Sequence, residues 1–232
     1  MTEGYDEAYN WTEEEAGNVS AALKSDMTAP FDFILEISAP PEKQEDGNII
    51  ADNNGLPVYA ERTLYVSTSF IKALSNARCK YIRFVLGDAA VQIDITPLLN
   101  NPAVAIRLDP LKADDLSEGE IKTLAGYDSN GKLYDFRVLR ESSGADLTED
   151  LAKTGALEVL LDVTKNGREA QNLAEILFLS EKRDEGRDEI EPSLLRSRRI
   201  SENGRLYLKG TAPGSGVFGL VQNKNKTSGN ET

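Results

Sequence analysis

The chain has 232 residues, a hydrophobic fraction of 40% and a formal net charge of −13, and an acidic surface of that size repels nucleic acid and anionic membranes. Histidine is absent and cysteine occurs once, which excludes Ser-His-Asp and Cys-His catalysis, His-ligated zinc and an internal disulfide. No apolar run reaches the roughly 20 residues of a membrane span. We therefore expect no nucleic-acid partner and no membrane span in this chain.

Polar segments flank the part of the chain that is expected to fold. Residues 1–26 are acidic and lack periodicity, which predicts a flexible acidic leader, and residues 223–232 predict a disordered tail. The acidic N-terminus does not resemble a signal peptide, so the protein is either cytosolic or an extracellular protein whose leader is absent from this chain. Between these ends, 27–110 and 111–222 are two β-rich halves, and the sequence leaves open whether they form one domain or two.

Turn signals recur between short apolar runs along the chain. They are Asp46-Gly47, Asn54-Gly55, Gly87-Asp88, Asn130-Gly131, Asn166-Gly167 and Asn203-Gly204. Asn-Gly pairs supply the positive φ angles that tight hairpin turns need. This punctuation predicts antiparallel strands.

The first half contains predicted strands at 31–39, 63–67, 80–86, 89–95 and 104–110. A short helix is expected after the second strand, because Phe70, Ile71 and Leu74 recur at helical spacing behind a capping serine, Ser67 or Ser69. The third and fourth strands form the clearest predicted hairpin, since both alternate and only two residues separate them. The Thr-Pro step that follows this hairpin predicts one helical turn.

The second half reads as further strands with two more short helices. The strands are expected at 133–140, 157–164, 175–181, 194–201, 205–210 and 216–222. Ser117 and Glu120 fit a capping box that begins one helix, and residues 146–154 form the other. Residues 181–192 are predicted to be a charged, solvated loop. Together these elements predict a mostly β (α+β) fold, an antiparallel β-sandwich-like module with short inserted helices.

The stretch YDSNGKLYDF, residues 127–136, is the strongest candidate for a cation site. A calcium loop needs oxygen ligands at its first, third and fifth positions, but Lys132 is fifth when counted from Asp128. The stretch SENGRLYL (201–208) repeats the Asn-Gly step with Arg205 in the place of the lysine. We therefore interpret both as hairpin turns and expect no cofactor, with calcium as the alternative. Cys79 is interpreted as a small buried residue.

A long segment, LYVSTSFIKALSNARCKYIRFVLGDAAVQIDITPLL (64–99), resembles one that recurs in secreted multidomain proteins of Gram-positive bacteria, which often carry S-layer homology domains. IRLDPLK, GKLYDFRV and LEVLLDV resemble the strands that follow it, and SRRISENGRLYLKGTAPGSGVFGLVQ (197–222) resembles the closing hairpin of that family. The closing pattern is distantly similar to the end of the self-cleaving GAIN module of adhesion receptors. That module cleaves at a His-Leu-Ser/Thr step, whereas this chain has Gly214, Ser215 and Gly216 and no histidine. The resemblance implies a stalk, spacer or adhesive module at a bacterial surface, without catalysis.

Three functional hypotheses follow. The first is a non-catalytic structural, spacer or adhesive module of a secreted or cell-surface bacterial protein, with neighbouring domains of a larger surface protein as its partners. The second is a carbohydrate- or protein-binding adhesin with a specific loop site for a wall or host ligand, in which Tyr127, Tyr134 and Tyr207 are stacking candidates. The alternative interpretation of these tyrosines is that they fill a half-buried strand face. The third hypothesis is a carboxylate-only or metal-dependent enzyme.

Overall fold

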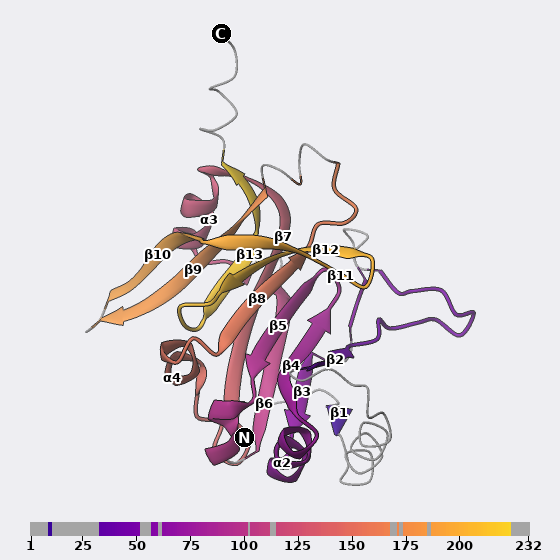
Figure 1. Cartoon of the computed structure of the whole chain (residues 1–232). Coiled ribbons are helices and arrows are strands. Elements are labelled where there is room, and N and C mark those ends of the chain that lie inside the picture. The colour runs from indigo at the N-terminus through magenta and orange to yellow at the C-terminus, as the bar shows by residue number, and fades with distance from the viewer. Residues whose placement is uncertain are drawn as a thin grey trace.

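The computed structural model describes residues 9–10, 33–51, 57–59, 62–101, 103–111, 115–167, 171, 174–184 and 187–223. Two sheets pack face to face as a β-sandwich, and three short α-helices lie at its ends and side (Figure 1). The predicted mostly β fold is therefore confirmed. Most of the predicted leader and nearly all of the predicted tail lie outside the described residues.

The seven-stranded sheet has the strand order β1-β3-β6-β7-β13-β9-β10. Its strands are β1 (Tyr9–Asn10), β3 (Thr63–Val66), β6 (Val104–Leu111), β7 (Tyr127–Arg140), β13 (Gly216–Asn223), β9 (Ala174–Asp184) and β10 (Arg187–Leu195). All pairings in it are antiparallel except that of β1 with β3.

The six-stranded sheet has the order β11-β12-β8-β5-β4-β2. Its strands are β11 (Ser197–Glu202), β12 (Arg205–Thr211), β8 (Leu157–Asp162), β5 (Ala89–Asp94), β4 (Cys79–Leu86) and β2 (Phe33–Ser38). The edge strand β2 runs parallel to β4, and the other pairs are antiparallel. Both sheets contain strands from 27–110 and from 111–222, since β6 pairs with β7 and β5 pairs with β8.

Alternating apolar residues of the two sheets form one shared core. On β4, Ile82 and Phe84 are buried in this core, while Arg83 between them points to the opposite face. Three of its phenylalanines contact one another. The ring centroid of Phe136 lies 5.9 Å from that of Phe218 and 6.4 Å from that of Phe178. Because residues from both halves of the chain contribute to this cluster, the halves share one hydrophobic core.

Several predicted turns are confirmed by the backbone. Gly87 and Asp88 join β4 to β5 as a two-residue turn, with φ +63° at Gly87. Asn203 and Gly204 join β11 to β12, and their φ angles of +50° and +75° are those of a type I′ turn. Gly47 also has a positive φ, +85°, in a turn that Gln44 and Asn48 close with a hydrogen bond. The predicted turn at 54–55 lies outside the described residues.

The predicted turn at Asn130-Gly131 is wrong. Residues 127–140 form the continuous strand β7, and its pairing with β13 shifts at this point. Gly219 faces Leu133 whereas Val221 faces Ser129, so β7 carries two extra residues there. Turn-forming residues make a bulge instead of a reversal when the chain on both sides of them finds a strand partner.

Two further predictions, for residues 181–192 and 194–201, are also wrong. Residues 181–192, expected to be a loop, belong to β9 and β10, where the register sets Lys182 opposite Glu189 and Arg183 opposite Asp188. The backbone N–H and C=O groups of this stretch find antiparallel partners, from Asp184 opposite Arg187 to Ile176 opposite Leu195, and this is the physical reason that it extends the sheet. Residues 194–201 are not one strand, because the chain leaves the seven-stranded sheet after Leu195 and joins the six-stranded sheet at Ser197.

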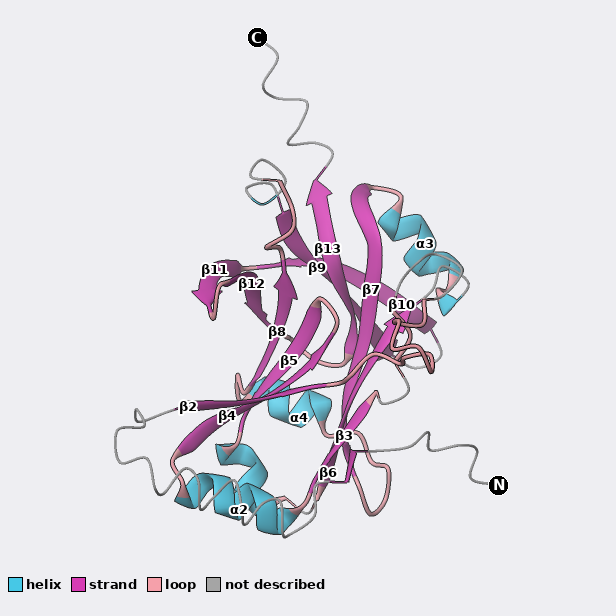
Figure 2. Ribbon diagram, turned by 90° about the vertical axis from the view of Figure 1, so that its right-hand side faces the viewer, coloured by secondary structure: helices cyan, strands magenta, loops and turns pink. Residues whose placement is uncertain are grey.

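The short helices match their sequence signals. They are α2 (Thr68–Asn76), α3 (Glu118–Leu124), α4 (Thr148–Lys153) and the 3₁₀ turn η1 (Thr96–Asn100). The Ser67 hydroxyl accepts a hydrogen bond from the Phe70 amide, and Ser117 with Glu120 forms the predicted capping box. Figures 1 and 2 place α2 and α3 at opposite ends of the sandwich.

Candidate functional site

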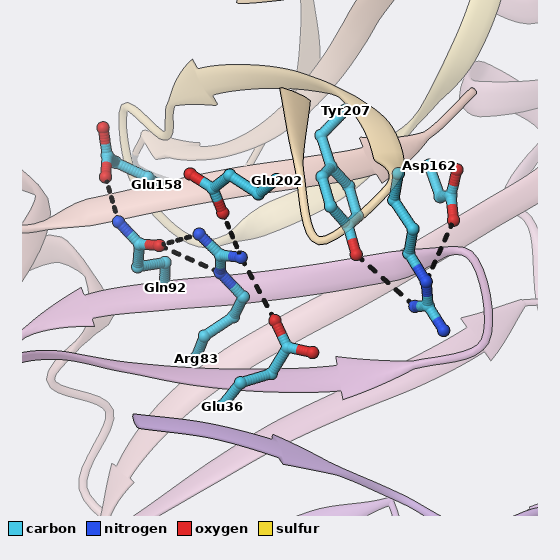
Figure 3. A network of polar contacts seen from close by, with 8 residues as sticks. Glu36, Arg83, Gln92, Glu158, Asp162, Glu202 and Tyr207 are labelled. Atoms are coloured by element: carbon cyan, nitrogen blue, oxygen red, sulfur yellow. Dashed lines mark hydrogen bonds and ion pairs between the residues drawn. The ribbon is translucent and has the colours of Figure 1, made fainter. Parts of the chain in front are cut away.

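A buried arginine on the outer face of the six-stranded sheet is the centre of a polar network. Arg83, on β4, is 2% exposed. Its Nε and Nη2 donate to Gln92 Oε1 at 3.0 and 2.6 Å, and its Nη1 donates to Glu36 at 3.1 Å and to Glu202 at 2.7 Å (Figure 3). These four residues are called the Arg83 clamp below.

The clamp joins strands that are far apart in the sheet order. Glu36 lies on β2 and Glu202 on β11, which are the two edge strands of the six-stranded sheet. One guanidinium can reach both edges only because the sheet coils strongly, so that β11 curves over the outer face toward β4. The clamp therefore holds the hairpin β11–β12 against the opposite edge of the same sheet.

The same outer face carries more paired charges around a small apolar patch. Glu158 accepts from Gln92 Nε2 at 2.7 Å and from Lys209 at 2.6 Å, and Lys209 is 7% exposed. Arg205 lies 3.9 Å from Asp162 and donates to the Tyr207 hydroxyl at 3.4 Å. Between these pairs, Val85, Ala90, Leu160 and Tyr207 form a separate buried cluster. The face is thus a second, largely polar core, and the charges named here each have an opposite partner.

A pocket opens between the two sheets at the turn that joins β4 to β5. Its volume is about 250 Å³. The six-stranded sheet contributes Asp88 and Asp162, and the seven-stranded sheet contributes Lys132 and Tyr134. Tyr59, from the segment before β3, lies at the same opening.

The polar groups of the pocket are close to one another. Lys132 forms an ion pair with Asp88. Burial raises the pKa of the Tyr134 phenol strongly, and the negative charge of Asp88 raises it further. Burial and Asp88 likewise raise the pKa of Tyr59. Both phenols are therefore protonated and able to donate hydrogen bonds throughout the neutral range.

The structure does not bring the three candidate tyrosines together. Tyr134 is 5% exposed and packs in the main core, and Tyr207 is 3% exposed and packs in the outer cluster. Tyr127 is half-buried beside a third cluster that includes Leu177 and Leu179. Neither Tyr134 nor Tyr207 lies in an exposed stacking face: Tyr134 points into the main core, and Tyr207 is covered on the outer face, where Arg83 lies 5.7 Å from its ring centroid.

Sequence reasoning missed Arg83, Gln92 and Lys209. Alternation on β4 already placed Arg83 on the face opposite the main core, which usually means a solvent-exposed side chain. One signal pointed to burial instead: Val85, two residues further along β4, is apolar and lies on the same face as Arg83. The coiling that brings β11 over this face has no local signature in the sequence.

Cys79 is buried, as expected. Burial raises the pKa of its thiol, and its Sγ donates to the Tyr81 carbonyl at 3.2 Å. The thiol is therefore protonated at neutral pH and is a poor nucleophile.

The part of the chain that the structure describes contains no cluster of three or more acidic or cysteine side chains arranged to hold a metal ion. Within the same described residues, no helix combines the length and the apolar character needed to cross a bilayer.

Comparison of the chain with protein-family models, with curated proteins and with solved structures gives no match.

Proposed function

We propose that the protein is a non-catalytic spacer module of a secreted or cell-surface bacterial protein, which holds neighbouring domains apart. One observation carries this proposal: from β2 onward, the described chain enters the sandwich at one end and leaves it at the other. β2 begins opposite Cys79, which follows α2 in the sequence. β13 ends opposite Tyr127, which follows α3. The two helices mark opposite ends of the molecule (Figure 2).

This geometry suits a module that transmits tension. Force applied through the two ends of this part pulls on β2 at one end and on β13 at the other, and β13 runs along the direction that joins the two ends (Figure 2). β13 is hydrogen-bonded on both sides, to β7 and to β9, and β2 is paired with β4. A pull along β13 must therefore break many backbone hydrogen bonds at once, whereas peeling at an edge breaks them one after another.

The Arg83 clamp strengthens the less protected of these attachments. β2 is an edge strand, so among the described strands of the six-stranded sheet it pairs with β4 alone. Glu36 adds a charged hydrogen bond from β2 to Arg83, which Glu202 and Gln92 hold in place. The attachment of β2 thus depends on β4, β5 and β11 together.

The available side-chain chemistry supports a role without catalysis. The chain has no histidine, and the pKa of its single thiol is raised by burial. The four outer-face acids described above each lie within 4 Å of a lysine or arginine: Glu36, Glu158, Asp162 and Glu202. The resemblance to modules of Gram-positive surface proteins supports the extracellular location and the neighbouring domains as partners.

The test is single-molecule stretching of the chain through its two ends. The proposal predicts one cooperative event that releases about 60 nm of chain, since the folded part from Phe33 to Asn223 extends at about 3.3–3.6 Å per residue. Stepwise extension, in which strands peel off at low force, would overturn it. Turnover of a polysaccharide or peptide by the pure protein would overturn the non-catalytic part.

A second candidate function is recognition of a small ligand, and the pocket between the sheets favours it. The pocket combines ionic, hydroxyl and apolar groups from both sheets in one opening, which is the usual composition of small-molecule sites.

A further inference from the structure

The pocket is assembled from segments that are distant in the sequence. Lys132 and Tyr134 come from β7, Asp88 from the turn between β4 and β5, and Asp162 from the end of β8. The bulge in β7 lies next to Lys132, because the register with β13 shifts between Leu133 and Ser129. Bulges re-aim side chains at functional sites, and here the re-aimed lysine pairs with Asp88.

Gly87 fits closely against this opening. Its φ of +63° is one that other residues rarely adopt, and a Cβ there would lie 3.0 Å from the Tyr59 hydroxyl. The turn thus favours glycine because of its positive φ, and also because a Cβ would crowd the Tyr59 hydroxyl. The tyrosine and the turn form one wall of the pocket.

The charges that line the pocket balance. Asp88 and Asp162 supply two negative charges, and Lys132 and Lys165 supply two positive charges. The rest of the chain is strongly acidic, with a net charge of −13, so this local neutrality sets the pocket apart. A charged ligand gains no net attraction from such a lining, whereas a neutral ligand finds both donors and acceptors.

Apart from Asn166, the remaining lining is apolar. Leu86 and Leu161 from the six-stranded sheet face Leu220 and Pro110 from the seven-stranded sheet. A ligand that fits must therefore present both apolar surface and hydroxyl-like groups. A volume of about 250 Å³ lies below the range of drug-sized sites, so it accommodates one small ring.

We propose that this pocket binds the ring of a neutral sugar, with the Tyr134 hydroxyl, Asp88 and Lys132 contacting sugar hydroxyls and the lining leucines contacting the C–H groups of the ring. This inference rests on the second candidate function, ligand recognition, and names its ligand class. It is independent of the spacer role.

The experiment is calorimetric titration with a matched series of sugars: glucose, which is neutral, glucuronate, which is anionic, and glucosamine, which is cationic. Glycine serves as a small zwitterionic probe without a sugar ring. Glucose is expected to bind with a Kd on the order of 1 mM and both charged sugars more weakly. Tyr134→Phe, which keeps the buried ring and removes only the hydroxyl, is expected to weaken glucose binding about tenfold.

Two further variants make the test specific. Tyr207→Phe removes a hydroxyl from a buried tyrosine outside the pocket and is expected to leave glucose binding unchanged. Lys165→Met gives the lining a net charge of about −1 and is expected to shift preference toward glucosamine. Circular dichroism confirms that each variant is folded.

The outcomes separate the ligand class from the function. Glucuronate, glucosamine or glycine binding more tightly than glucose, with loss in Tyr134→Phe, would overturn the neutral-sugar proposal and leave ligand recognition intact. Absence of binding by all four probes would overturn both. Glucose binding that Tyr134→Phe does not weaken would overturn the assignment to this pocket.

Discussion

Replacing Arg83 with methionine tests the clamp. Methionine fills much of the same volume but cannot donate hydrogen bonds. Gln92 is fully buried, and its Oε1 loses both donors, which costs about 1–3 kcal/mol. Glu36 and Glu202 each lose a charged hydrogen bond, but their side chains are 34% and 33% exposed, so water offsets most of this and they add about 1 kcal/mol.

The expected total is a loss of about 3 kcal/mol in the free energy of unfolding, at the low end of values for a broken buried ion pair. For a domain of this size the midpoint of thermal unfolding falls by about 6–12 °C. The assay is urea unfolding followed by circular dichroism at neutral pH. The matched control is Lys153→Met, because the Lys153–Asp150 pair is 70% and 78% exposed and contributes less than about 0.5 kcal/mol. Equal, small losses in the two variants would refute the reasoning.

Three other predictions use the same urea assay. Gly219→Ala is expected to lower the free energy of unfolding by about 1–3 kcal/mol, because a Cβ there would lie 2.7 Å from the Lys132 carbonyl and closer still to Leu133. Gly167→Ala is the control and should cost far less, because a Cβ at Gly167 would meet no atom within 4 Å. Equal costs in the two variants would contradict this prediction. Ser117→Ala removes the N-cap of α3 and should cost about 1 kcal/mol, and an unchanged urea midpoint would show that the cap contributes nothing. The pKa of the Tyr134 phenol is raised in the folded state, so the folded state holds this proton more tightly than the unfolded state, in which the pKa is near 10.0. The stability that this difference contributes is complete below pH 10.0 and is lost as the pH rises above it. The urea midpoint should therefore fall at alkaline pH, and less steeply in Tyr134→Phe; parallel curves would refute this.

The strands and caps could be predicted because their signals are local. The alternation of Ile82 and Phe84 with Arg83 gave the strand and its two faces, and the Ser117–Glu120 spacing gave the helix start. Asn203-Gly204 was predicted correctly as a turn, because its flanking strands pair with each other. Asn130-Gly131 has the same local chemistry but became a bulge, because β7 continues alongside β13 on both sides of it.

The candidate site could be predicted only in part. Tyr134 was singled out in the sequence, but its position at a pocket between two sheets depends on which strands become neighbours. The approach of Glu202 to Arg83 depends on how far the six-stranded sheet coils, which is a property of the whole sheet. Pairing of residues 119 positions apart leaves no local pattern in a single sequence.

The central claim is that the sandwich resists force between its two ends because this direction pulls lengthwise on β13, which is paired on both sides, and loads β2, which the Arg83 clamp attaches. The most direct measurement compares the unfolding force in two pulling directions, one through both chain ends and one between the C-terminal end and a linkage at Gly204, the tip of the β11–β12 hairpin. The account predicts a clearly higher force through the chain ends, since the second direction peels an edge hairpin from the sheet. An equal or lower force through the chain ends would contradict the spacer proposal.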